Sequence, residues 1–319
     1  MRARQAALAT EAVAEQAALA HLAGGGGALG AVLAGFFAAA GARPGVLLGP
    51  VSALVAGVGQ GARAFDGRSR QPGLGTKRPR GFLTADEVPD AARVAAPSAP
   101  FAAVVAQAYA GDSLRSLIAP GVEAAQRAGA ELRARFLERL GQVGAPALVE
   151  PTFKRAMLRV GAASEGGLLT PSDLEKCEDV DQPVSERSER DARWLEPGWA
   201  AQATEQPGND RGAGVCAADM HGVVAALCYR ICEVGALLDE LELVAPHSAV
   251  PVMRGVPRLA PGSRLQAAAP MALRLDESQR PTELLLEAES LRLDLSTPKN
   301  QRLALRRDPA TLFVSGVRL

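Results

Sequence analysis

Two apolar runs around one tight turn constrain the fold more than any other feature of this sequence. The runs 212–218 and 223–231 consist almost wholly of small and apolar residues. They flank the turn Asp219–Gly222, whose glycine can adopt a positive φ. The segment just before them, ending at residues 206–210, is polar and predicts a surface loop. We therefore expect a buried β-hairpin that is entered from an exposed loop.

The hairpin segment resembles the start of the small subunit of the γ-glutamyltransferases, a family of N-terminal-nucleophile hydrolases. In those enzymes the loop is cut, and the first residue of the following strand becomes both nucleophile and base. The residues in step with the family pattern are Cys216, Ala217, Ala218, Asp219, Gly222, Leu227 and Tyr229. The resemblance implies an α/β (α+β) fold, a four-layer αββα sandwich with two mostly antiparallel central sheets. We expect it to be trimmed, because the section 177–210 is much shorter than in the family.

The family register places the nucleophile at Gly212, which has no side chain to attack with. Ala213 and Gly214 stand where the family has a second threonine and a histidine. Without a hydroxyl or thiol, neither self-cleavage nor acyl transfer by the family route has an attacking atom. The first hypothesis is therefore a non-catalytic pseudoenzyme. It would bind a small amino-acid-like or γ-glutamyl ligand of the glutathione kind, or assemble with a protein partner such as an active paralogue.

The second hypothesis is a repurposed γ-glutamyl transferase or amide hydrolase that acts on a glutamyl-like substrate through Cys216. This residue follows the lost nucleophile on the same expected strand. If the chain were cut before Cys216, its thiol and the new α-amino group would form a nucleophile–base pair. The competing interpretation is a small buried residue, which is the commoner fate of a free cysteine.

A second group of residues matches a substrate-binding motif of the same family. Asp66, Arg68 and Pro72 match a family motif, Asp-x-Arg-Glu-x-Ala-Pro, whose arginine grips the substrate α-carboxylate. A guanidinium suits that task, because its planar fork matches a carboxylate in two hydrogen bonds. The alternative is an exposed arginine in a basic loop, since Arg63 and Lys77 lie close by in the sequence.

Three carboxylates stand where the family binds the substrate α-amino group: Asp239, Glu240 and Glu242. We favour the interpretation that they are plain surface carboxylates. Other family positions have lost their functional residues. Gln266 and Ala267 replace the paired serines that bind the α-carboxylate. The run Pro281–Ser290 parallels the oxyanion-hole segment, and Glu289 and Ser290 replace its two glycines, where a negative charge opposes an oxyanion.

Local patterns predict much of the remaining secondary structure. The sequence indicates helices over 100–109 and 131–140, a helix beginning at Pro151, and a short helix capped by Thr170 with Asp173. We expect one strand within 50–63 and one or two strands in 303–319. The resemblance implies one domain over 1–319, with a large-subunit-like part, 1–211, and a small-subunit-like part, 212–319.

The run from Gln16 to Ala42 contains no charged residue and is long enough to span a membrane. It is mostly alanine and glycine, with four consecutive glycines at Gly24–Gly27. Such a composition inserts weakly, so a buried helix with a glycine turn is the preferred interpretation.

Charge and cysteine content narrow the function further. With 35 Lys+Arg against 35 Asp+Glu, the chain has no global field to attract nucleic acid or an anionic membrane. The 4 cysteines are too few and too unevenly placed for a disulfide framework. The 3 histidines share no metal-ligand spacing with cysteine or carboxylate, and no phosphate loop or dinucleotide fingerprint occurs, so we expect neither metal nor cofactor. The start of the chain lacks the uninterrupted apolar core of a signal peptide, which predicts a cytoplasmic protein.

Overall fold

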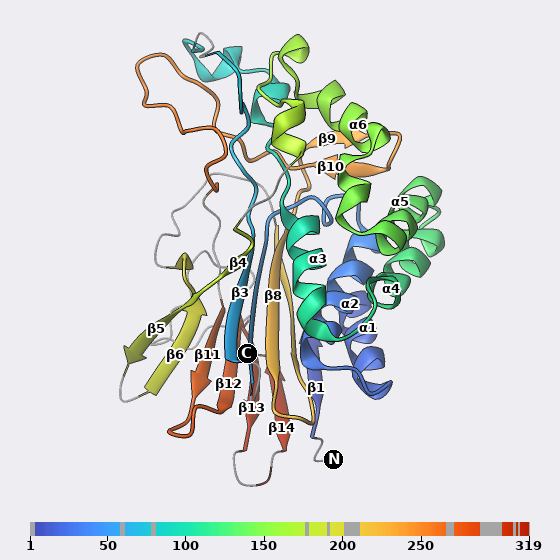
Figure 1. Ribbon diagram of the computed structural model, residues 1–319, viewed down its shortest axis with the longest axis vertical. Helices are drawn as coiled ribbons and strands as arrows, with labels where there is room; N and C mark the ends of the chain where they lie inside the picture. The colour runs from blue at the N-terminus through green and yellow to red at the C-terminus, as the bar shows by residue number, and fades with distance from the viewer. Residues whose placement is uncertain are drawn as a thin grey trace.

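Two antiparallel β-sheets and one layer of helices form most of the structure (Figure 1). The computed structural model describes residues 4–57, 61–77, 81–175, 179–189, 192–200, 211–265, 271–287, 302–308, 311 and 313–318. The first sheet has the strand order β1-β7-β8-β2-β3-β4, with β1 Ala6–Ala9, β7 Arg211–Ala218, β8 Val224–Ile231, β2 Val51–Gly57, β3 Gly61–Gly67 and β4 Asp181–Gln182. The second has the order β14-β13-β12-β11-β6-β5, with β14 Val314–Arg318, β13 Arg302–Arg307, β12 Pro281–Glu287, β11 Met271–Leu275, β6 Ala192–Pro197 and β5 Val184–Glu189.

Helices cover one face of the first sheet (Figure 1). They are α1 Ala12–Ala23, α2 Ala28–Ala42, α3 Ala99–Ala110, α4 Leu114–Arg127, α5 Glu131–Val143 and α6 Pro151–Gly161. Short 3-10 helices connect several of them: η1 Ala85–Glu87, η2 Asp90–Arg93, η3 Ala145–Val149, η4 Ala163–Glu165 and η5 Pro171–Leu174. A small two-stranded sheet, β9 Ala236–Leu238 and β10 Leu243–Ala245, lies beside α6 at the upper end of Figure 1.

The expected hairpin is confirmed as β7 and β8, which pair from Arg211 with Ile231 to Ala218 with Val224. Gly222 closes the turn with φ 99°. The Asp219 carboxylate holds this turn, because its Oδ1 accepts hydrogen bonds from the backbone N–H groups of His221 (2.9 Å) and Val223 (3.0 Å). Its Oδ2 accepts one from Ala28 N–H (3.0 Å), at the start of α2. Asp219 therefore ties the central hairpin to the helical layer.

The uncharged run near the N-terminus forms the end of α1, a glycine turn and α2. Every residue of α2 from Ala28 to Gly41 is buried. Its small side chains allow close packing: a Cβ at Gly41 would overlap the carbonyl oxygen of Gly121 in α4. None of the helices in the described part of the chain combines the length and apolar character needed to cross a bilayer.

Two hydrophobic cores result from this layering. One lies between the helices and the first sheet, where Phe36 of α2 packs edge-on against Tyr229 of β8. The other fills the space between the sheets, with Leu54, Cys216 and Cys228 on one side and Leu284 and Leu305 on the other. The expected α+β sandwich with two mostly antiparallel sheets is therefore confirmed.

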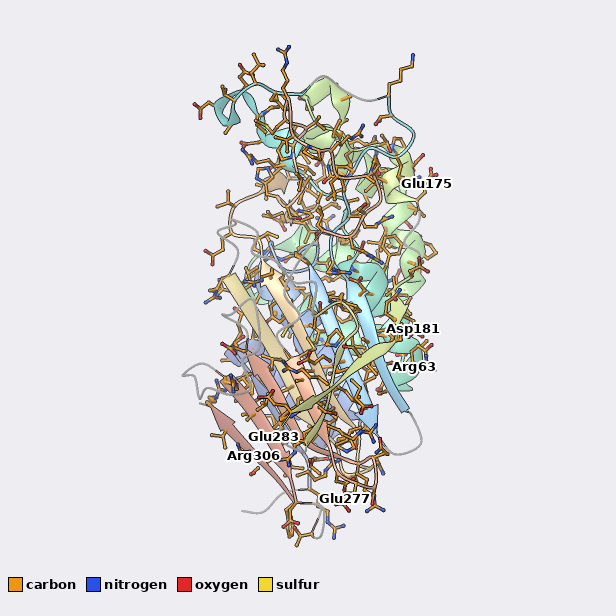
Figure 2. The ribbon with its side chains drawn as sticks, turned by 90° about the vertical axis from the view of Figure 1, so that its left-hand side faces the viewer. Arg63, Glu175, Asp181, Glu277, Glu283 and Arg306 are labelled. Carbon is orange, nitrogen blue, oxygen red and sulfur yellow. The ribbon has the colours of Figure 1, made fainter. Side chains whose placement is uncertain are left out.

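The outer face of the second sheet carries no helix formed by the residues that the structure describes. Figure 2 views this face, on which Glu283 and Arg306 of adjacent strands form an ion pair of 2.7 Å. The described layers are thus helices, sheet and sheet, and a second helical layer is not among them.

Several local predictions are confirmed and one is corrected. Helices α3, α5 and α6 begin at or within one residue of the expected positions, and Thr170 and Asp173 form a capping box on η5. The expected single strand in 50–63 is wrong, because this segment belongs to two strands, β2 and β3. In the run compared with the oxyanion-hole segment, Pro281–Glu287 forms β12 in the middle of the second sheet.

Candidate functional site

A cavity of about 760 Å³ opens at the end of the first sheet where β3 finishes. Its lining includes residues of the segment after β3, of η5 and β4, and of the ends of two loops: Asp66, Arg68, Arg70, Leu74, Ser172, Glu175, Asp179, Gln182, Pro183, Gly198, Trp199, Gly262 and Arg264. The size falls within the roughly 300–1,000 Å³ that is usual for small-molecule sites. Of the predicted site residues that the structure describes, only Arg68 lines this cavity.

Arg68 is buried, with 8% of its surface exposed, which excludes the solvated loop arginine of the alternative interpretation. Its Nε donates to Asp66 Oδ1 (3.0 Å) and its Nη2 to Asp66 Oδ2 (2.8 Å). The fork that the resemblance assigns to a substrate carboxylate is therefore filled by a carboxylate of the chain itself. Within the described residues, Nη1 makes no hydrogen bond, and this atom remains for a ligand.

Two further arginines line the cavity beside Arg68. Arg70 donates from Nε to Ser98 Oγ (3.2 Å) and from Nη2 to the carbonyl of Asp173 (2.7 Å). Arg264 donates from Nη1 to the carbonyl of Arg68 (3.0 Å), and its Nε lies 3.5 Å from Asp66 Oδ2. Arg68 and Arg70 share one side of an extended segment because they are two residues apart. The two-residue spacing of Arg68 and Arg70 is visible in the sequence, but the proximity of Arg264 to them is not.

Trp199 forms a wall of the cavity and was not expected as a site residue. Its ring centroid lies 5.1 Å from the guanidinium carbon of Arg68, a cation–π arrangement, and only 4% of the residue is exposed. The same side chain packs into the core between the sheets. The other tryptophan, Trp194, is on the outer face of the second sheet with Ala272 and Leu285. Of the two tryptophans, Trp199 lines the cavity and Trp194 does not.

The three carboxylates that the resemblance compared with ammonium acceptors lie outside the lining of the cavity. Asp239 and Glu240 form exposed ion pairs with Arg159 of α6, at 3.1 and 2.9 Å. Glu242 accepts hydrogen bonds from the backbone N–H groups of Leu132 (3.0 Å) and Arg133 (3.3 Å), in the first turn of α5. It thereby caps that helix. The structure brings none of the three to Arg68.

Gly212 lies at the start of β7, at the same end of the sheet as Arg68. It pairs with Arg230 of β8, whose N–H donates to Pro50 just before β2, and β2 begins opposite Gly67 of β3. Three strand spacings separate the two positions, about 14 Å. Gly212 shares its face with Cys216, which lies in the core between the sheets, because alternate residues of a strand point the same way. A side chain at 212 would therefore point between the sheets, and none is present.

Cys216 lies inside β7 rather than at its start, and it is 0% exposed. Burial raises the pKa of its thiol to about 12, so the nucleophilic thiolate is scarce at neutral pH. Val215, which would have to be cut from it, is paired with β1 on one side and with β8 on the other. The geometry gives the Cys216 hypothesis no support. Cys177, Gln266, Ala267, Glu289 and Ser290 lie outside the described residues.

The layered sheets, the central hairpin and the cavity at the strand ends define the fold class, an α+β sandwich. No family model and no curated protein sequence matches the chain.

Solved structures do match. LmbA2991T421A superposes with a TM-score of 0.77 at 14% identity, covering 99% of this chain and 97% of that one. Cephalosporin acylase from Bacillus halodurans gives 0.73 at 12% identity, with 100% and 94% covered. The gamma-glutamyltranspeptidase of Helicobacter pylori gives 0.50 at 18% identity, with 59% and 68% covered. At these identities the likeness establishes the fold.

Proposed function

We propose that this protein is a non-catalytic, γ-glutamyltransferase-like protein that binds a small ligand bearing a carboxylate in the cavity beside Arg68. The proposal rests on the register of the family resemblance, which puts the nucleophile position at Gly212. The structure supports it with one observation: Gly212 lies at the start of β7, on the face toward the space between the sheets. A chain with no hydroxyl or thiol there has no atom to attack its own backbone or a substrate.

The binding part of the proposal is supported by the charges on the cavity wall. Arg68, Arg70 and Arg264 converge there, and Asp66 is the buried carboxylate that contacts two of them. The Arg68 Nη1 atom adds a charged donor next to the Trp199 ring. Charged donors held in place by their own partners favour an anionic ligand, since little side-chain entropy is lost on binding.

The non-catalytic part is tested by the intact mass of the purified protein under denaturing conditions. We expect a single species near 33.0 kDa. We also expect no release of product from a chromogenic γ-glutamyl anilide, with an active γ-glutamyltranspeptidase assayed in parallel as the positive control. Two fragments would refute the proposal, and a smaller fragment that begins at Cys216 would establish the repurposed enzyme instead.

The binding part is tested by calorimetric titration with γ-glutamylglycine. Arg68→Lys keeps the charge but removes the planar fork, so it breaks the pair with Asp66 and should weaken binding about tenfold or more. Arg254→Lys is the matched control, because Arg254 is exposed and outside the cavity lining. Equal affinities for the wild type and the Arg68 variant would contradict the assignment of the site.

A further inference from the structure

The cavity distributes its charges unevenly between its buried base and its rim. At the base, Arg68 and Arg70 are 8% and 7% exposed. At the rim, Asp179 and Glu175 are exposed, and Figure 2 shows Glu175 near the edge of the molecule. A ligand that entered would therefore meet carboxylates first and guanidinium groups last.

The two rim carboxylates differ in their availability. Glu175 is held by Lys154, with Nζ 3.1 Å from Oε1. The Asp179 carboxylate makes no hydrogen bond or ion pair within the part of the chain that the structure describes, although its backbone carbonyl accepts from Gln182 Nε2 (2.7 Å). Asp179 also has φ 58°, a left-handed conformation that aspartate and asparagine tolerate better than most residues. Its side chain is therefore the rim group best placed to receive a cation.

The size of the cavity argues against a single amino acid as its ligand. A cavity of about 760 Å³ lies in the upper part of the roughly 300–1,000 Å³ range of small-molecule sites, and a free amino acid leaves most of it to water. A short peptide fills more of this volume and can reach from the arginine base to Asp179. The carbonyls of Arg68 and Asp179 both accept from the guanidinium of Arg264, at 3.0 and 3.4 Å. The carboxylates that the resemblance compared with acceptors for an α-amino group lie outside the cavity lining: Asp239, Glu240 and Glu242.

We infer that the cavity binds a short peptide with its C-terminal carboxylate at the arginine base and its N-terminal ammonium group at Asp179. This inference rests on the proposed binding function and names the ligand class and its direction. The direction differs from that implied by the family resemblance, in which the α-carboxylate and α-amino group of one glutamyl unit bind together.

The test compares tetra-alanine with three relatives: its C-terminal amide, its N-acetyl form and free alanine. Uncharged side chains leave the two termini as the only charges. Binding is followed by the fluorescence of Trp199 in a Trp194→Phe background and by calorimetry on the wild type, so the measurement does not depend on that variant. We expect the amide to bind about tenfold or more weakly, because it loses a charge-assisted pair at buried arginines. The acetylated form should bind a fewfold more weakly, because Asp179 is exposed.

The variant Asp179→Asn isolates the rim contact. It should abolish the difference between tetra-alanine and its acetylated form while leaving the tenfold effect of the amide. Asp86→Asn, at an exposed aspartate outside the cavity lining, is the matched control and should behave as the parent does.

Any of three results would overturn the inference. The C-terminal amide could bind as tightly as tetra-alanine, or free alanine could bind as tightly as tetra-alanine. The third result is that acetylation of the N-terminus weakens binding more than amidation of the C-terminus does. Any of these, together with intact binding of γ-glutamylglycine through Arg68, would refute the peptide assignment alone. Self-cleavage of the chain would instead refute the non-catalytic proposal and leave the peptide comparison standing.

Discussion

Asp219 matches the family pattern, and the structure predicts that its role here is to stabilise the fold. The residue is 3% exposed, and its two oxygens accept three backbone hydrogen bonds. Asp219→Ala leaves these three N–H groups without an acceptor, at about 1–3 kcal/mol for each buried group. The His221 N–H is only partly buried and can be hydrated, so we expect a total loss of about 3–5 kcal/mol in the free energy of unfolding.

A second variant separates the contacts of the two oxygens. Asp219→Asn keeps the Oδ1 acceptor for His221 and Val223 but turns an N–H toward the N–H of Ala28. One hydrogen bond to a charged acceptor is lost, so the expected cost is about 1.5–3 kcal/mol. The melting temperature should fall by about 6–10 °C for the alanine variant and about half as much for the asparagine variant.

Urea unfolding and calorimetry measure both changes. Asp86→Ala, at an exposed aspartate, should stay within about 0.5 kcal/mol of the wild type. The reasoning fails if Asp219→Ala costs less than about 1 kcal/mol, or if the asparagine variant is as damaging as the alanine variant. The second outcome would mean that the Oδ2 contact with α2 outweighs the two contacts within the turn.

Further predictions concern the buried thiol and the helix packing. Cys216 should resist thiol reagents at pH 8 in the folded protein and react after unfolding, since burial raises its pKa to about 12; reaction of the native thiol would contradict this assignment. Because the folded-state pKa lies above the unfolded one, the stability from this group is present below about pH 9 and decreases toward pH 12, by up to about 1.4 kcal/mol per pH unit. Urea unfolding should show a smaller decrease in the free energy of unfolding between pH 8 and pH 10 for Cys216→Ala than for the wild type. Gly41→Ala should lower the free energy of unfolding by about 1–3 kcal/mol, because the new Cβ overlaps the Gly121 carbonyl. Gly141→Ala in α5 should be neutral or stabilising, because the nearest contact of its Cβ is at 3.4 Å. Equal effects of the two variants in urea unfolding would refute the packing argument.

Several residues that the sequence analysis singled out stabilise the fold. Thr170 caps η5 and receives the N–H of Asp173, while the Asp173 carboxylate accepts from Gly73 and Leu74 in the loop beside the cavity. Glu242 caps α5. Such residues can match a family's pattern through their part in the fold. Matches at these residues therefore support the architecture and carry no information about activity.

The error over 50–63 has a physical origin. The segment contains three glycines, Gly57, Gly59 and Gly61, which are a turn signal. Strand β2 pairs with β3 on one edge and with β8 on the other. Farther along the chain, Leu284–Leu286 are buried in β12 between β11 and β13. In both segments, pairing with distant strands set the structure.

Local patterns were sufficient for the hairpin, several helices and the Thr170 cap, because periodicity and turn residues are readable along the chain. The site itself required the tertiary structure. Arg68 meets Trp199 and Arg264 only because the sheet ends and the loops after β6 and β10 converge at one point. Asp66 fills the Arg68 fork from only two residues away, whereas Asp239 and Glu240 lie on the surface beside Arg159 of α6. Contacts between segments up to 196 residues apart depend on strand register and packing, which no local pattern encodes.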